Sequence, residues 1–412
     1  MNRTTIFCLA LALAVGIGTP AAQAQTFSVI HTFTGGGDGA TPEAGVTYRA
    51  GTLYGTAEYG GNGYGTVYET MPLGNNWFTL PIFLFNGTDG AYPMARVVFG
   101  PDGHPYGTTV NGGTYGGGVV FDLIVPLTIC KTASCFWKEN VLYQFMFDPD
   151  GADPYYGDLT WDPQGINIYD TTIYGGAYNL GAVYELMPNG SGGWKESVIY
   201  SFTGPDGEYP ENTVIFDTSN DNYNNGSLFG TAYQGGLHGA GTVFELTKYM
   251  NQWLETNAYN FQNGSDGGYP VAGLVFDNNN PANLYGATTN GGSGGGGTIF
   301  ELSPLNGTWT FTLLYSFSGG ANCGPRGTLT FDATFTNLYG TTYCDGKYNL
   351  GNIFKLTKVG NTWAYTDLYD FMGGNDGANP IGIVTIGGDG NLYGTASKGG
   401  TQGVGVVWQI KP

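Results

Sequence analysis

Positively charged residues are scarce in this chain, which has 13 Lys and Arg among 412 residues, against 32 Asp and Glu. A surface this acidic repels phosphate backbones and anionic lipid headgroups, so we expect neither nucleic acid nor a membrane surface as a partner. Histidine is scarcer still, with three residues. A histidine metal centre or a Ser/His/Asp catalytic system is therefore not expected, and we expect no cofactor.

Long apolar runs are also missing, with one exception near the N-terminus. Residues 6–18 read IFCLALALAVGIG, follow Arg3 and lead to the small residues around Ala24. This pattern is typical of a signal peptide over 1–24 that is cleaved after Ala24. The run is too short for a good membrane-spanning helix. We therefore expect a secreted or periplasmic protein without membrane insertion. Without residues 1–24, and so without Arg3, it would have 12 basic and 32 acidic residues and a formal charge of −20.

Glycine and aromatic residues are abundant, with 73 Gly, 30 Tyr and 24 Phe, and they recur in a fixed order. Seven copies of one unit follow each other between Gln25 and Pro412. The fourth copy begins with an aromatic strand end at 200–202 and a D-G-x-x-P turn at 206–210. A short strand at 214–216, an LYGT-like strand at 228–231 and a GTVFEL-like strand at 241–246 follow. Short strands separated by Gly, Asn or Asp are typical of an antiparallel meander.

The repeat length and the two chain ends together predict a closed ring. A unit of about 55 residues lies in the range of a four-stranded propeller blade. Residues 25–33 correspond to the last strand of a unit, and the chain ends after the third strand of another. We predict an all-β, seven-bladed β-propeller as one domain over 25–412, in which 25–33 completes the C-terminal blade as its outer strand. A linear β-solenoid is the alternative.

Tryptophan has a regular position in the outer strand. In six units a Trp precedes the last Phe of that strand by eight residues, as Trp194 precedes Phe202. Because side chains alternate between the two faces of a strand, this even spacing predicts that both rings lie on one face.

Aspartate recurs in the turn of six units, as Asp206 does in the fourth. These carboxylates would suit a ring of Ca²⁺ ligands, but an Asx hydrogen bond that caps each turn is the favoured interpretation. His31 stands where other units have Tyr, which predicts a packed strand residue.

Five cysteines are present, and one of them leaves with the signal peptide. An even count in an exported chain favours two disulfides over a metal site. Cys323 replaces the turn aspartate of the sixth unit, and Cys344 lies between the second and third strands of that unit, which predicts a bond between them. Cys130 and Cys135 lie in one insertion and are expected to close a small loop there.

The repeated motifs resemble the GloVer tandem repeat of bacterial choice-of-anchor proteins. The clearest copies are 266–302, which contains DGGYP, GLVFD, NLYGATT and GTIFEL, and 376–395. The resemblance covers essentially all of 25–412. It implies an exported bacterial propeller and supplies no catalytic residue.

Functional residues are expected where the repeats differ at equivalent, exposed positions. In a meander blade, the turn before the inner strand and the loop between the second and third strands lie on one face, which we call the upper face. The inner strands line the central channel, so the residues beside each turn surround its upper mouth. The candidate ligand-binding residues are Glu43, Tyr92, Arg96, Tyr155, Asp158, Tyr209, Glu211, His238, Tyr269 and Arg326.

Tyrosine offers a flat apolar face and one hydroxyl, which suits sugar rings or peptide segments. The tyrosines of this set would stack on a ligand, the arginines would orient anionic or polar groups, and the carboxylates would accept hydroxyl or amine hydrogens. We therefore expect a non-enzymatic, monomeric binding module for a glycan or an extracellular protein.

Two other functions stay open. A carbohydrate-active enzyme, either a glycoside hydrolase or a polysaccharide lyase, would need two carboxylates at a working separation, or a Tyr or His base beside a cation. Its candidates are Glu43, Glu211, Asp158, Tyr155 and His238. A passive cell-surface repeat protein without a dedicated ligand is the third hypothesis.

Overall fold

The computed structural model describes residues 25–126, 135–217, 226–250 and 252–412. Within these ranges the secondary structure consists of strands. The expected signal peptide and Cys130 lie outside the described residues.

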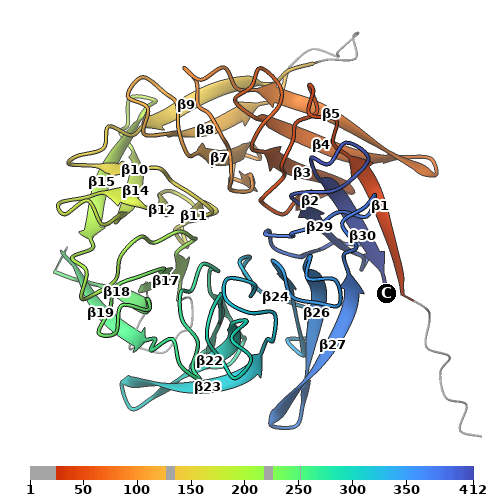
Figure 1. Ribbon diagram of the computed structural model, residues 1–412. Coiled ribbons are helices and arrows are strands. Elements are labelled where there is room, and N and C mark those ends of the chain that lie inside the picture. The colour runs from red at the N-terminus through yellow and green to blue at the C-terminus, as the bar shows by residue number, and fades with distance from the viewer. Residues whose placement is uncertain (1–24, 127–134, 218–225, 251) are drawn as a thin grey trace, which may run out of the picture.

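Seven four-stranded antiparallel sheets are arranged radially around a central axis, which confirms the propeller (Figure 1). From the inner to the outer strand, blade 1 has β2 (Thr47–Arg49), β3 (Thr52–Ala57), β4 (Thr66–Leu73) and β5 (Asn76–Leu84); blade 2 has β6 (Val98–Phe99), β7 (Pro105–Thr109), β8 (Val119–Ile124) and β9 (Lys138–Gln144); blade 3 has β11 (Thr160–Trp161), β12 (Ile168–Thr172), β14 (Ala182–Pro188) and β15 (Trp194–Ser201).

The remaining blades repeat this order. Blade 4 has β16 (Ile215–Phe216), β17 (Leu228–Ala232), β18 (Thr242–Tyr249) and β19 (Gln252–Asn260); blade 5 has β20 (Val275–Phe276), β21 (Leu284–Thr288), β22 (Thr298–Leu305) and β23 (Thr308–Ser316); blade 6 has β24 (Thr330–Phe331), β25 (Asn337–Thr342), β26 (Asn352–Val359) and β27 (Thr362–Asp370); blade 7 has β28 (Thr385–Ile386), β29 (Leu392–Ala396), β30 (Val406–Lys411) and β1 (Thr26–Thr32). A two-stranded ladder of β10 (Gly151–Ala152) and β13 (Tyr174–Gly175) joins a turn to a loop in blade 3.

The two ends of the chain close the ring, as the repeat phase predicts. Strand β1 runs antiparallel to β30, with Thr26 opposite Lys411 and Thr32 opposite Val406 (Figure 1). This pairing covers the edge that β30 would otherwise expose.

Apolar side chains between neighbouring blades form the core. Between blades 4 and 5, for example, Val243 and Phe261 pack with Leu284 and Phe300. In blade 4, the second strand has Gly230 at the position where the ring of Phe244, from the third strand, packs against its backbone. At Gly230 an added Cβ would lie 2.4 Å from the ring of Phe244, so a larger residue would push the ring away.

The prediction that Trp and Phe share one face of the outer strand is wrong. In β15 the register against β14 shifts by one residue between the partners of Val183 and Tyr184. This β-bulge reverses the alternation of side chains. Trp194 therefore packs toward blade 2 with Phe145, and Phe202 packs toward blade 4 with Phe244.

The turn aspartates have the expected structural role, but they cap the end of the preceding outer strand and not, as an Asx turn would, the N–H two residues further on. The backbone N–H of Thr203 donates to Asp206 Oδ1 (2.8 Å) and that of Met372 to Asp376 Oδ2 (2.8 Å). The tyrosine of the strand adds a second donor, as in the bond from Tyr369 to Asp376 (3.0 Å). His31 takes this tyrosine's place, with 3.2 Å between Nε2 and Oδ2 of Asp38.

Cys323 and Cys344 form the predicted disulfide of blade 6, with 4.4 Å between their Cα atoms. Cys135 is also disulfide-bonded. The structure places no helix of membrane-spanning length and hydropathy within the described ranges.

Candidate functional site

Backbone hydrogen bonds tie each turn of the upper face to the loops beside it. In blade 4 the N–H of Tyr233 donates to the carbonyl of Tyr209 (3.1 Å), and the N–H of Tyr209 donates to the carbonyl of Leu180 in blade 3 (2.9 Å). The equivalent bonds recur at Tyr269 in blade 5. Turns and loops thus meet on one face, as expected, and backbone hydrogen bonds between them hold the mouth residues in place.

Three tyrosines of the mouth have a backbone conformation that is unusual for a large side chain. The residue before the turn proline is left-handed, with φ of 60° at Tyr92, 54° at Tyr209 and 57° at Tyr269. This conformation costs a non-glycine residue roughly 1–2 kcal/mol, and Asn or Asp tolerate it best. Asp153 and Asn379 occupy the same position in other blades. The fold therefore does not need tyrosine here.

Each of these tyrosines packs against a second tyrosine from the neighbouring loop. The pairs are Tyr59–Tyr92, Tyr174–Tyr209 and Tyr233–Tyr269, with ring centroids 5.4, 5.7 and 5.4 Å apart. Tyr59 and Tyr174 remain 46% and 40% exposed. Tyr59 and Tyr174 thus present an aromatic ring to solvent, and the other four rings of the pairs are half-buried.

The central channel below the mouth is almost filled by side chains. Its cavity has a volume of about 30 Å³, room for about two water molecules. The polar side chains that line it are Glu43, Arg96, Tyr156, Asp158, Asn212, Arg326 and Thr328. A ligand larger than water would therefore lie across the mouth and not within the channel.

Arg96 and Asp158 neutralise each other inside the channel. The guanidinium donates from Nε (2.9 Å) and Nη2 (2.5 Å) to Oδ2 of Asp158, and the backbone N–H of Arg96 donates to Oδ1 (3.1 Å). Both side chains are about one-fifth exposed. Each of these two candidate ligand-binding residues therefore already has the other as its ion-pair partner.

Glu43, Glu211 and Arg326 form an electrostatic cluster where the channel opens. Burial raises the pKa of Glu43, which accepts a hydrogen bond from Tyr156 (3.0 Å). Burial also raises the pKa of Glu211 to about 7, and the charge of Arg326 opposes both shifts. The guanidinium of Arg326 lies over the ring of Tyr343 at 4.2 Å, and its buried Nε–H has no acceptor among the described residues.

A third carboxyl, Glu58, belongs to the same cluster. It is 7% exposed, and burial raises its pKa to about 7. Its hydrogen bond with Tyr59 raises the pKa of that phenol to about 12. Burial raises the pKa of Tyr155, and the charges of Glu43, Glu211 and Glu58 add to that shift.

The sequence matches the profile of the Gloeobacter/Verrucomicrobia repeat over residues 19–224 and 216–412. The chain belongs to this family. The resemblance that the repeated motifs indicate is thereby confirmed. No curated protein matches the chain significantly.

Solved structures similar to this Gloeobacter/Verrucomicrobia repeat protein share little sequence identity with it. An ancestral GH74 enzyme aligns with a TM-score of 0.54 at 13% identity, over 89% of this chain and 48% of its own. The extracellular domain of a proposed one-component system of B. thetaiotaomicron gives 0.53 at 10%, over 92% and 39%. A hypothetical selenium-binding protein of Sulfolobus tokodaii gives 0.51 at 10%, over 79% and 78%.

These likenesses establish the fold alone. This repeat protein spans less than half the length of the first two structures. What those proteins bind or catalyse therefore does not transfer with the fold.

Repeat alignment missed Tyr156 as a channel residue because blade 3 carries one extra residue. Five positions separate Pro154 from Leu159, but four separate Pro93 from the equivalent Val97. Counting back from Leu159 would have placed Tyr156 in the channel and Tyr155 beside it.

His238 is exposed in the loop between β17 and β18. No interaction found among the described residues joins it to the cluster around Arg326. The expectation that it contributes to the mouth therefore has no contact to support it.

Blade 3 has a second departure from its repeat family. Asp170 replaces the glycine of the second strand and is fully buried. One carboxyl oxygen lies 2.1 Å from where a Cβ of Gly157 would be, so the side chain fills the space beside the channel strand. Burial raises the pKa of Asp170 well above its ordinary value, which favours the neutral acid.

Proposed function

We propose that this protein is an exported binding module that recognises a glycan at the upper mouth of the propeller. The observation that carries the proposal is the placement of Tyr92, Tyr209 and Tyr269 in a left-handed conformation, where Asn or Asp would cost less. Strain of this kind is retained where the side chain serves a function.

The chemistry of the mouth suits sugars. Paired tyrosine rings present apolar faces on which the C–H face of a sugar ring stacks, and their hydroxyls add polar contacts. Glu43 and Glu211, at the opening of the channel, would accept hydrogen bonds from sugar hydroxyls, and the nearby positive charge of Arg326 would favour the ionised form of both carboxyls. The nearly filled channel favours a ligand that lies flat across several blades, as an oligosaccharide does.

The test is binding of the protein of residues 25–412 to arrayed glycans, followed by calorimetry with the best binder. Y209N and Y269N are the variants of choice, because blade 7 has Asn379 in the same left-handed position and the fold should be kept. Each variant should weaken binding about tenfold, since one stacking ring contributes on the order of 1.4 kcal/mol.

Y249A is the matched control, because Tyr249 is 59% exposed at the end of β18, away from the upper face. It should bind the glycan as tightly as the wild type. An equal loss of glycan affinity in Y249A and Y209N, or no glycan bound at all, would contradict the proposal. Release of sugar products during binding would instead favour the carbohydrate-active enzyme, for which the raised pKa values of Glu58 and Glu211 suit an acid catalyst.

A further inference from the structure

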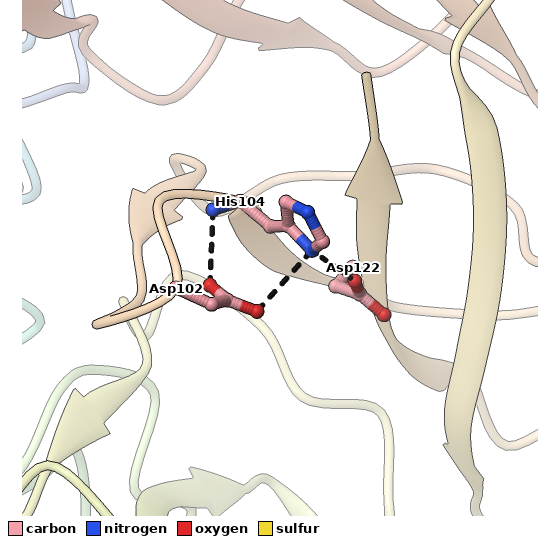
Figure 2. A group of neighbouring side chains, drawn as sticks. All are labelled: Asp102, His104 and Asp122. Carbon is pink, nitrogen blue, oxygen red and sulfur yellow. Dashed lines mark hydrogen bonds and ion pairs between the residues drawn. The ribbon is translucent and has the colours of Figure 1, made fainter. Parts of the chain in front are cut away.

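A second group of convergent side chains lies on the lower face of blade 2, opposite the mouth. Asp102 and His104 come from the loop between β6 and β7, and Asp122 comes from β8 (Figure 2). Nδ1 of His104 lies 3.0 Å from Oδ2 of Asp122 and 3.2 Å from Oδ2 of Asp102. One ligand atom from each of the three residues lies within 4.8 Å of the others.

The other blades show that the fold does not require this set. In blade 7, Asp389, Asn391 and Gln409 occupy the three positions, and the amide of Asn391 donates to Oδ2 of Asp389 (2.7 Å). Blades 3, 5 and 6 also have Asn at the position of His104, as Asn167, Asn283 and Asn337. An amide nitrogen can donate a hydrogen bond but cannot bind a metal, whereas an imidazole nitrogen can do both.

Two repeat positions change together in blade 2. Histidine replaces the Asn, Ser or Thr of the other blades, and Asp122 replaces a residue that is Glu in four of them, at 69, 185, 245 and 301. Tyr106 faces Asp122 across the ladder, as Tyr54 faces Glu69, so the two positions are equivalent. The two changed residues contact each other directly, and together they convert a hydrogen-bonded loop into a set of one nitrogen and two oxygen ligands.

Both carboxylates of the set accept hydrogen bonds from neighbouring side chains, as metal ligands usually do. Asn140 donates to Oδ1 of Asp122 (2.8 Å), which fixes that carboxylate and leaves Oδ2 directed at His104. The hydroxyl of Tyr106 donates to Asp102 (2.7 Å). Such outer hydrogen bonds orient ligating carboxylates. The Asp122 side chain is 5% exposed and that of Asp102 is 45% exposed, so the site is closed on one side and open to solvent on the other.

We propose that Asp102, His104 and Asp122 bind one divalent transition-metal ion, with Zn²⁺ as the best match. Nδ1 of His104 lies within 3.2 Å of one oxygen of each of the two carboxylates, so the three ligand atoms converge on one point. A divalent cation would balance both carboxylates. One imidazole nitrogen with two carboxylate oxygens is a donor set that Zn²⁺ accepts, and the solvent-facing side would admit a water as fourth ligand.

The experiment is a calorimetric titration of the metal-free protein of residues 25–412 with Zn²⁺, and with Ca²⁺ in parallel. We expect one equivalent of Zn²⁺ and a higher Tm in its presence. H104N and D122E should each lower the affinity at least about tenfold, and both should fold, because other blades carry these residues at the same positions.

H238N is the control, because it removes an exposed histidine from the opposite face and should leave the affinity unchanged. The proposal is overturned if the wild type shows no saturable Zn²⁺ binding, if H104N binds as tightly as the wild type, or if Ca²⁺ binds in preference to Zn²⁺. Co²⁺ in place of Zn²⁺ gives a second readout, because its visible spectrum should change on binding to the wild type and not to H104N.

Discussion

The carboxyl groups of the upper mouth lie in surroundings that favour their neutral forms. Burial raises the pKa of both Glu58 and Glu211 to about 7, and the nearby Arg326 only partly offsets the shift at Glu211. A carboxyl that is half neutral near pH 7 can either donate or accept a hydrogen bond, which suits a surface that recognises sugar hydroxyls.

The raised pKa of Glu211 makes stability depend on pH. Its folded pKa of about 7 lies above the ordinary 4.5, so the folded state holds the proton more tightly than the unfolded state. The resulting stabilisation is complete below pH 4.5 and is lost as the pH rises to about 7. E211Q should therefore be more stable than the wild type at pH 8 by about 3 kcal/mol, with little difference at pH 4. Urea unfolding at both pH values tests this, and a difference that does not change with pH would contradict it.

At the scale of elements, the β-bulge gives the outer strand two different roles. One extra residue between the halves of β19 directs Trp253 toward blade 3 and Phe261 toward blade 5. Each outer strand thus joins three blades, which a regular strand with all its large rings on one face would not do.

Blade 6 achieves the turn cap of the other blades with a different residue. Its turn has Ala321 where the others have Asp, so the prediction that Cys323 replaces this aspartate is wrong: Cys323 lies two residues further on, at the position of Glu208 in blade 4. The N–H of Ser318 donates instead to Oδ2 of Asp345 in the next loop (3.3 Å). The disulfide to Cys344 holds that loop against the turn.

Removal of this disulfide should destabilise the protein. The bond closes a loop with a sequence separation of 21, for which the entropy lost by the unfolded chain corresponds to about 3 kcal/mol. C323S/C344S should lose about that much free energy of unfolding in urea. The double variant separates this bond from that of Cys135, which a reductant would also break. Unchanged stability of the variant would show that hydrogen bonds such as that of Asp345 suffice.

At the scale of the whole molecule, closure of the ring rests on one strand. Phe33 is fully buried between blades 7 and 1, and Phe27 stacks on Tyr369 of blade 6 with ring centroids 3.6 Å apart. Strand β1 therefore contributes to the contacts on both sides of blade 7 besides covering the edge of β30.

Deletion of residues 25–33 should abolish the single cooperative thermal transition and promote self-association, because it exposes a strand edge and two apolar interfaces. Calorimetry and size-exclusion chromatography measure both effects. A circular permutant that starts at Asn361 and ends at Gly360, with Pro412 linked to Gln25 by a short Gly/Ser linker, keeps β1 and opens an exposed hairpin instead. It should retain the wild-type Tm within a few degrees. A deletion variant that unfolds like the wild type would show that β1 is dispensable.

The sequence by itself determines the strand order, the number of blades and the closure by 25–33, because these follow from a pattern repeated along the chain. It also predicts the bond between Cys323 and Cys344, because both cysteines fall in the same unit. Only the tertiary structure decides which side chains meet. The Arg96–Asp158 pair joins residues 62 positions apart, and His104 meets Asp122 across 18. A repeat pattern gives each residue its place in a blade, but one bulge or one inserted residue redirects the side chains that follow. Whether two side chains come within a few ångströms of each other therefore depends on how neighbouring blades pack.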